Sequence, residues 1–379
     1  MSPNFERQVF CLLGLPFDVI DLAGAVRVVQ SSARARTPCF FSTPNTNFVV
    51  TAQRDDAFRA SVYRSDLSLI DGMPLLWMAR LLGLPFRERV AGSALFEALR
   101  RSTANPISVY FFGGPDGVAA AAAQQLNAKP QGLRCVGHDS PGFVPVEAMS
   151  DAARIARINA SAADFVVVSL GAKKGQAWIE RNRARLRAPV ISHLGAVVNF
   201  VAGTVRRAPG WMQRSGIEWL WRIREEPALW RRYAQDAMAA SKLLCQCVIP
   251  YAWHLYFNRP DAAEQGSANV QVERGAATTV VHLRGAWAHS NLGPVRRAFT
   301  DVAGCVHSLR LDLSAVTHVD SAFVALLGLL KAHRDQNGQQ TEIIGVLPSV
   351  RRVFGYCCAL FLLDAQPPKA QVTMTESAP

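Results

Sequence analysis

The stretch V-Y-F-F-G-G-P-D-G-V-A-A-A-A-A-Q-Q-L, residues 109–126, decides the fold class. Its apolar start predicts a buried strand over Val109–Gly113, and after a glycine-proline turn its alanine-rich end predicts a helix over Gly117–Leu126. The same order recurs through the first half of the chain. The other predicted strands are Pro38–Val50, Phe165–Leu170 and Val190–Leu194, and the other predicted helices are Val49–Ser61, Met73–Leu82, Ala91–Arg101, Val146–Asn159 and Gln176–Leu186. Strands that alternate with helices predict an α/β fold with a largely parallel sheet, whose ligands bind beyond the carboxyl ends of the strands.

A second, smaller α/β domain is predicted after a polar linker at residues 259–268, R-P-D-A-A-E-Q-G-S-A. The predicted strands there are Thr278–Leu283, Ser308–Leu313 and Glu342–Val346, and the predicted helices are Leu292–Phe299, Ala322–His333 and Ser349–Phe354. We therefore divide the chain into a first domain (1–258), the linker, a second domain (269–365) and a disordered tail (366–379). Because the second domain has its own strands and helices, we expect it to fold alone.

The composition indicates an anionic partner, because the 379 residues carry a net charge of +12 and the pI is near 9.7. No homeodomain, zinc-finger or RNP-type pattern is present, so we expect no nucleic-acid partner. The eight cysteines are scattered without the spacing of zinc ligands. We find neither a signal-peptide layout nor an apolar run of about 18 residues, which predicts a cytoplasmic protein.

The best candidate for membrane contact is Leu243–Phe257, L-L-C-Q-C-V-I-P-Y-A-W-H-L-Y-F. It is too short to span a bilayer and contains a proline, but its aromatic residues are typical of a head-group boundary. A buried helix explains the same pattern equally well. Together with the basic charge, the first reading predicts a peripheral protein on the inner face of the cell membrane.

Residues 203–233, G-T-V-R-R-A-P-G-W-M-Q-R-S-G-I-E-W-L-W-R-I-R-E-E-P-A-L-W-R-R-Y, interleave arginine with tryptophan. Guanidinium groups match phosphate oxygens, and tryptophan favours places that are dry at one end and wet at the other. The segment therefore suits an anionic, partly apolar ligand. A solvated amphipathic helix, in which glutamates neutralise part of the charge, is the alternative.

Several motifs in one order resemble the WecG/TagA/CpsF glycosyltransferases over about Phe10–Tyr233. They are T-P-N from Thr43, S-L-I-D-G-M-P from Ser68, R-V-A-G-S from Arg89, F-F-G-G-P from Phe111, G-H-D-S-P-G-F from Gly137, and R-R-A-P through W-R-R-Y at the arginine-rich end. The resemblance implies a Rossmann-like domain that moves a sugar from a UDP-sugar to a polyprenyl-diphosphate-linked sugar with inversion, in surface polysaccharide biosynthesis.

The resemblance also implies roles for single residues. Asp71, in the D-G motif, would be the general base, although an Asp-Gly turn is common in any protein. Thr43 and Asn45 would orient the substrate, or Asn45 would cap a helix. Arg89 would bind phosphate or the acceptor, or would form a surface ion pair with Glu88.

The remaining candidates would bind the diphosphate and the donor. Gly113 and Gly114 end a strand before a helix, where backbone N–H groups cradle phosphate. Arg206, Arg207, Arg222 and Arg232 match the arginine-rich segment of the family, and we expect them to neutralise the leaving group without a metal or other cofactor.

Two departures weaken the match. Gly175 stands where the family has glutamine, so that Gln176 would have to serve, and Asn199 stands where it has aspartate. A catalytically weakened scaffold is therefore the alternative to an active enzyme.

The second domain resembles STAS domains through R-L-D-L-S-A-V-T-H-V-D-S-A, Arg310–Ala322. In the anti-sigma antagonists a phosphorylated serine follows the D-S pair, whereas this chain has Ala322. We therefore expect a module that docks a protein partner and takes no part in the chemistry.

Overall fold

The computed structural model describes residues 4–364, so the tail predicted at 366–379 lies outside the described residues. The first domain is built on a six-stranded sheet in which every pair is parallel, in the order β4-β3-β8-β7-β5-β6. Its strands are β3 (Cys39–Ser42), β4 (Leu67–Ser68), β5 (Ile107–Gly113), β6 (Leu133–Asp139), β7 (Phe165–Ser169) and β8 (Val190–His193). The predicted α/β class and the parallel sheet are confirmed.

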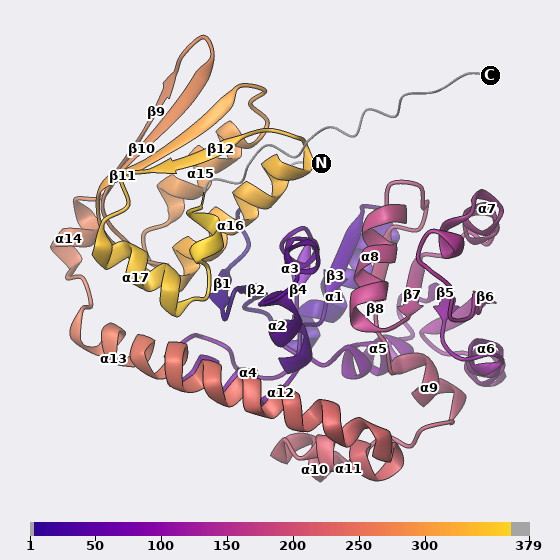
Figure 1. Ribbon diagram of the computed structural model, residues 1–379. Helices are drawn as coiled ribbons and strands as arrows, with labels where there is room; N and C mark the ends of the chain where they lie inside the picture. The colour runs from indigo at the N-terminus through magenta and orange to yellow at the C-terminus, as the bar shows by residue number, and fades with distance from the viewer. Residues whose placement is uncertain (1–3, 365–379) are drawn as a thin grey trace, which may run out of the picture.

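Helices cover both faces of this sheet (Figure 1). One face packs against α1 (Leu22–Ala35), α5 (Gly92–Arg101), α6 (Val118–Ala128) and α9 (Val197–Ala202), and the other against α7 (Ala152–Ala160) and α8 (Ala172–Asn182). Strands buried on both faces are apolar throughout, as the run in β7 shows.

The predictions for residues 38–61 were wrong in two places. The strand predicted over Pro38–Val50 stops at Ser42, because the Asn45 side chain accepts a hydrogen bond from the Phe48 N–H and caps α2 (Thr46–Ala52). The predicted helix Val49–Ser61 is interrupted in the same way, since Asp55 caps a separate helix, α3 (Asp56–Tyr63).

The second domain has a four-stranded sheet in the order β12-β11-β10-β9, with β9 antiparallel to β10. Its elements are β9 (Asn269–Arg274), β10 (Thr278–Trp287), α15 (Gly293–Ala303), β11 (Ser308–Val319), α16 (Ser321–Gln336), β12 (Thr341–Ile344) and α17 (Pro348–Tyr356). The predicted linker contains a short helix, α14 (Ala262–Gly266), which starts with a capping box between Asp261 and Glu264.

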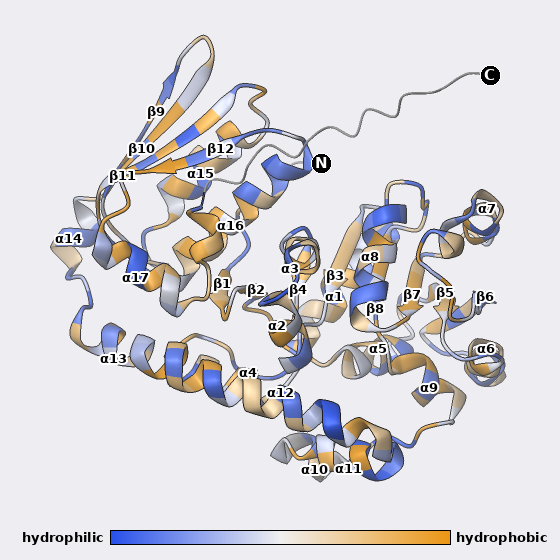
Figure 2. Ribbon diagram, in the orientation of Figure 1, coloured by the Kyte–Doolittle hydropathy of each residue, from blue (hydrophilic) through white to orange (hydrophobic). Residues whose placement is uncertain are grey.

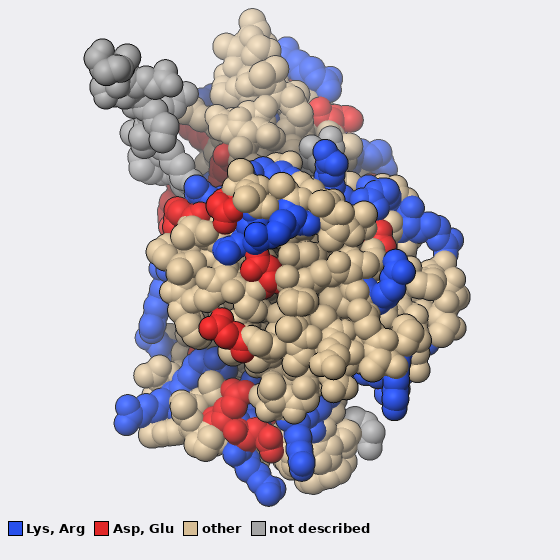
Figure 3. Space-filling view, turned by 90° about the vertical axis from the view of Figure 1, so that its right-hand side faces the viewer, with Lys and Arg blue, Asp and Glu red and all other residues tan. Residues whose placement is uncertain are grey.

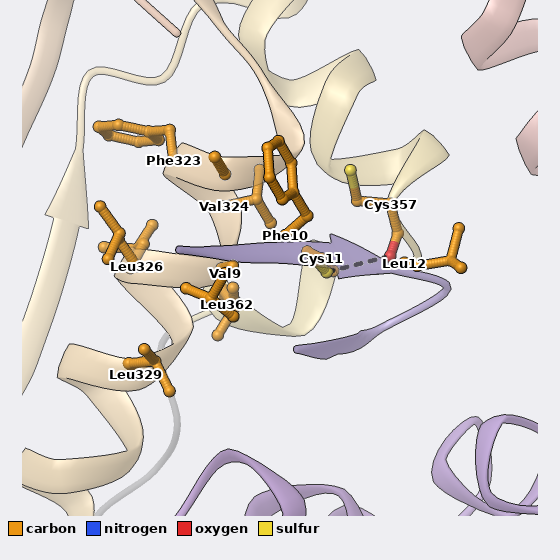
Figure 4. Packing of buried hydrophobic residues seen from close by; sticks show 14 of the residues in the cluster. Val9, Phe10, Cys11, Leu12, Phe323, Val324, Leu326, Leu329, Cys357 and Leu362 are labelled. Carbon is orange, nitrogen blue, oxygen red and sulfur yellow. Dashed lines mark hydrogen bonds between the residues drawn. The ribbon is translucent and has the colours of Figure 1, made fainter. Parts of the chain in front are cut away.

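The two domains share one hydrophobic core. An antiparallel hairpin near the N-terminus, β1 (Val9–Leu12) and β2 (Leu15–Asp18), packs against α16 of the second domain (Figure 4). A backbone hydrogen bond crosses the same boundary, from the Gly14 N–H to the Cys357 carbonyl at 2.6 Å. The expectation that the second domain folds alone does not fit this arrangement, because separating the domains would expose the core to water.

A long helical rod connects the two domains along one side of the molecule (Figure 1). It consists of α12 (Trp230–Leu243), a π-helical turn at Leu244–Val248, and α13 (Ile249–Phe257), which leads to α14. Polar and apolar residues alternate along it (Figure 2). Before the rod, the arginine-rich segment forms α10 (Gly210–Ser215) and α11 (Glu218–Glu225).

Candidate active site

A groove of ≈ 1130 Å³ opens beyond the carboxyl ends of β4, β3, β8 and β7. The segments that follow these strands form one wall, as expected for a parallel sheet. The opposite wall consists of α4 (Met73–Leu81), α11 and α12. Of the residues predicted for the site, the groove brings together Thr43, Asn45, Asp71, Arg89, Arg222 and Arg232.

Asp71 lies in the groove wall directly after the buried Ile70. Its N–H donates to the Pro44 carbonyl at 3.0 Å, which ties the segment after β4 to the segment after β3. Gly72 follows with a φ of 155°, a conformation that favours glycine and turns the chain into α4. Burial raises the pKa of the Asp71 carboxyl to about 6, and Arg89 opposes this shift. A carboxyl group with this pKa is ionised at neutral pH and still basic enough to accept a proton.

Arg89 forms an ion pair with Glu218 of α11 at 3.0 Å, with both side chains largely buried. The alternative of a surface pair with Glu88 is wrong, since the Glu88 carboxylate accepts from the Leu22 N–H. Arg89 therefore joins the D-G segment to the arginine-rich segment. Both partners act on Asp71, Arg89 lowering the pKa of its carboxyl and Glu218 raising it.

Thr43 and Asn45 lie beside Asp71 at the end of β3. The Thr43 side chain is 6% exposed and lines the groove. Asn45 caps α2 through its Oδ1, as the structural alternative predicted, and still lines the groove. Its Nδ2 has no hydrogen-bond partner within the described part of the chain, so the amide is free to donate to a ligand.

The four arginines predicted to neutralise the diphosphate differ in position. Arg222 and Arg232 line the groove, and the Arg222 guanidinium lies over the Phe200 ring at 5.4 Å. Arg207 is close enough to Asp71 to lower the pKa of its carboxyl, whereas Arg206 is exposed and accepts the Trp221 indole N–H through its carbonyl. The arginine-rich segment therefore contributes two guanidinium groups to the groove, of which that of Arg222 also pairs with Glu226 at 3.5 Å.

Besides Arg206 and Arg207, three predicted residues are not among those that line the groove. Gly113 lies against β7, where a Cβ would be 2.6 Å from the Ser169 carbonyl, so a close approach of two strands requires this glycine. Gly114 follows it with open space around its Cα. Gln176 is 0% exposed, and its Nε2 donates to Ser42 Oγ at 2.9 Å.

The opposite wall carries an apolar patch beside Arg222 and Arg232. The sequence predicted apolar contacts from the tryptophans of residues 203–233 but missed those of α4. Trp77 and Leu81 of α4 are 50% and 54% exposed, and Trp219 and Trp230 are 43% and 54% exposed. They face the groove together with Leu244 of the π-helical turn. The sequence contained one signal, because a tryptophan and several leucines lie in the short helix directly after the D-G motif. A groove that combines guanidinium groups with an apolar patch suits a ligand that carries both kinds of group.

His193, Asn199 and Asp236 also line the groove. The Asp236 carboxylate accepts from the Asn47 amide at 3.3 Å, and burial raises the pKa of this carboxyl. Asn199 has a buried Oδ1 without a partner among the described residues. Over residues 4–364, no group of three or more His, Cys, Asp or Glu side chains is arranged to hold a metal ion.

The exposed aromatic side chains of α13 lie beyond the apolar patch of the groove, farther along the same rod. Trp253, Tyr256 and Phe257 are 64%, 77% and 66% exposed, whereas Tyr251 is buried against the second domain. One side of this helix is therefore buried, and the other side exposes aromatic side chains. Within residues 4–364, no helix combines the length and the apolar character needed to cross a bilayer.

Comparisons with known proteins place both domains. The model of the glycosyl transferase WecG/TagA/CpsF family matches residues 10–251, and that of the Mlab, STAS domain matches residues 270–357. A relative from Bacillus spizizenii, named N-acetylglucosaminyldiphosphoundecaprenol N-acetyl-beta-D-mannosaminyltransferase, is 29% identical over 195 residues, covering 51% of this chain and 74% of the relative. A protein of the same name from Staphylococcus aureus is 25% identical over 222 residues, covering 56% of this chain and 82% of the relative. The family match extends over the sheet and the groove, and the chain belongs to the WecG/TagA/CpsF family of glycosyltransferases.

Proposed function

We propose that this protein transfers a sugar from a UDP-sugar to a sugar that is linked to a polyprenyl diphosphate, with inversion at the anomeric carbon, in surface polysaccharide biosynthesis. The observation that carries the proposal is the position of Asp71 in one groove with arginine side chains and an apolar patch. The names of the relatives describe an acceptor of the same class, a sugar on a diphosphoundecaprenol.

The reaction is a single displacement. Asp71 takes the proton from the acceptor hydroxyl, whose oxygen attacks the anomeric carbon as the bond from that carbon to the diphosphate oxygen breaks. Thr43 and Asn45, at the end of the adjacent strand, hold the reacting sugar through their hydroxyl and amide groups. Attack from the side opposite the leaving group inverts the configuration.

The leaving UDP carries a negative charge that the arginines stabilise. Arg222 and Arg232 are in the groove, and Arg207 is near enough to act on Asp71. Guanidinium groups bind diphosphate oxygens with paired hydrogen bonds, which suits them to the role that a divalent metal has in other enzymes.

The acceptor lipid lies along the apolar patch of the groove and leaves the groove towards the membrane. Trp77, Leu81 and Trp230 supply apolar surface beside the reacting end. We propose that the exposed aromatic residues of α13 lie at the inner membrane surface, with the basic segment near the anionic head groups. Figure 3 shows Lys and Arg side chains projecting from the lower end of the molecule, where Figure 1 places α10 and α11.

We also propose that the second domain binds a protein partner. The start of α16 is closed to such a partner, because Ser321 and Ala322 are each 1% exposed and Tyr251 of α13 lies beside them. A partner would instead meet the open face of the sheet, which carries the Arg310–Glu342 ion pair and the His282–Asp312 pair.

The proposed function is tested by incubating the purified protein with a panel of UDP-sugars and a short-chain polyprenyl diphosphate N-acetylglucosamine in detergent. We expect one donor to be transferred, with the opposite anomeric configuration in the product and with full activity in EDTA. Activity that is lost in EDTA and restored by magnesium would contradict the role of the arginines. Tight binding of UDP and of the lipid without turnover would favour the scaffold.

The membrane contact is tested with the double variant Trp253→Ala/Phe257→Ala. Its affinity for vesicles of phosphatidylglycerol and phosphatidylcholine should fall by about tenfold or more, because burying one large apolar side chain contributes about 1.5–3 kcal/mol. Co-sedimentation measures this affinity. Phe143→Ala is the matched control, since Phe143 is 93% exposed and lies in the first domain away from the rod. Equal binding by both variants would contradict the proposed membrane face.

A further inference from the structure

His193 ends β8 and occupies space that two glycines leave open. A Cβ at position 175 would lie 2.2 Å from its Cδ2, and a Cβ at position 195 would lie 3.2 Å from its Cε1. The ring is 7% exposed and lies 6.2 Å from the ring of Phe48, measured between centroids. Gly175 therefore leaves room for the His193 ring, which any larger side chain at position 175 would displace.

One hydrogen bond fixes which ring nitrogen carries the proton. Nε2 of His193 is bonded to the backbone carbonyl of Leu170. A carbonyl oxygen only accepts, so Nε2 carries the hydrogen, and Nδ1 of the neutral ring is an acceptor. Burial lowers the pKa of His193, which keeps the ring neutral at pH 7.

Nδ1 of His193 is the ring nitrogen that remains available to a ligand. It has no hydrogen-bond partner in the part of the chain that the structure describes, and its surface is not fully buried. Because His193 lines the groove, Nδ1 is open to whatever the groove holds. A fixed, neutral acceptor at the edge of a polar wall is suited to recognise an N–H or O–H group of a ligand.

The strand order indicates which part of the donor carries the N–H or O–H group that would bond to Nδ1. Asp71 follows β4, Thr43 follows β3, and His193 ends β8, which are neighbouring strands. Adjacent strands are about 4.8 Å apart, so His193 is roughly 10 Å from Asp71 along the edge of the sheet. A nucleotide sugar that reacts beside Asp71 and lies along this edge has its nucleoside near His193.

We propose that Nδ1 of His193 accepts a hydrogen bond from the nucleoside of the donor, and that His193 is a binding and specificity-determining residue. The inference rests on the proposed function. Two nucleoside groups have the required chemistry, the N3–H of uracil and a ribose hydroxyl. Only the first distinguishes uracil from cytosine, because N3 of cytosine carries a lone pair and would face the lone pair of Nδ1.

The test compares His193→Phe, which keeps an aromatic ring and removes the acceptor, with the unaltered protein. We expect the Kd for UDP, measured by calorimetry at pH 8, and the KM for the donor to rise about three- to tenfold, the value of one hydrogen bond. The kcat and the KM for the acceptor should not change, because His193 is distant from Asp71. His193→Asn, whose Oδ1 can replace Nδ1, should retain part of the affinity. His138→Phe is the control, since His138 is exposed on β6.

Parallel titrations with CDP identify the nucleoside group. A loss of affinity for UDP alone assigns the base N–H, and an equal loss for both nucleotides assigns a ribose hydroxyl. Unchanged UDP binding in His193→Phe, or equal weakening in the Phe and Asn variants, would overturn the inference. If the unaltered protein binds no UDP, the proposed function itself fails. Failure of the proposed function is therefore distinguishable from failure of the inference about His193.

Discussion

Asp71→Asn should lower kcat by about 10²–10⁴-fold, the usual contribution of a positioned general base, while UDP binding stays unchanged. The amide matches the carboxylate in size and still fits beside the Gly92 N–H, so the groove should keep its shape. Asp116→Asn makes the same change at an exposed carboxylate and should keep full turnover. Near-normal turnover in Asp71→Asn would remove Asp71 from the mechanism.

The same carboxyl predicts the pH dependence of the unaltered enzyme. A general base works in its deprotonated form, and burial raises the pKa of Asp71 to about 6. Therefore kcat/KM should be constant above that pH and fall about tenfold per unit as the pH drops below it. The residual activity of Asp71→Asn should lack this decline, and a decline centred near pH 4 would show that the carboxyl is not buried in solution.

The sequence predicted the charged half of the site because that half lies where strands end. Thr43 and Asp71 follow short apolar runs, and the parallel sheet brings these ends to one edge. Arg89 lies in the loop between α4 and α5 and was predicted from its motif. Periodicity does not show the direction of a side chain within such a segment. Gln176 was therefore expected in the site although it is buried on Ser42, whereas His193 was read only as the end of a strand.

The shared core was missed because the second domain was judged by its own alternation of strands and helices. The sequence of α16 argues against a second domain that folds alone. This helix, S-A-F-V-A-L-L-G-L-L-K-A-H-R-D-Q, is apolar on every side from Ala322 to Leu330. A helix of this kind is buried on all sides. The second domain covers only part of the surface of α16, and β1 and α3 of the first domain cover another part. Gly328 marks the closest approach, since a Cβ there would lie 2.2 Å from the Tyr63 ring.

Truncation after Asn258 should abolish turnover in vitro, contrary to the expectation that the second domain is dispensable for chemistry. The deletion removes α16 and exposes the apolar face of the hairpin, where Val9, Phe10 and Leu12 are at most 5% exposed (Figure 4). The deletion also removes Tyr356, on which Tyr251 stacks. The α13 end of the rod, which follows the part that lines the groove, therefore loses its contact with the second domain. Truncation after Asp364 keeps every described residue and should keep full turnover.

A single substitution tests the same coupling without deleting a domain. Leu326 is 0% exposed in α16, and Leu326→Ala should lower the free energy of unfolding by about 2–5 kcal/mol, as buried leucines do. Because the core is shared, calorimetry should show one transition at a lower temperature and not two. Turnover and UDP binding should be lost with that transition, although Leu326 is not part of the groove. If the second domain melts first and the first domain keeps binding UDP at the original temperature, the two domains are energetically separate and the shared core does not hold the groove in place.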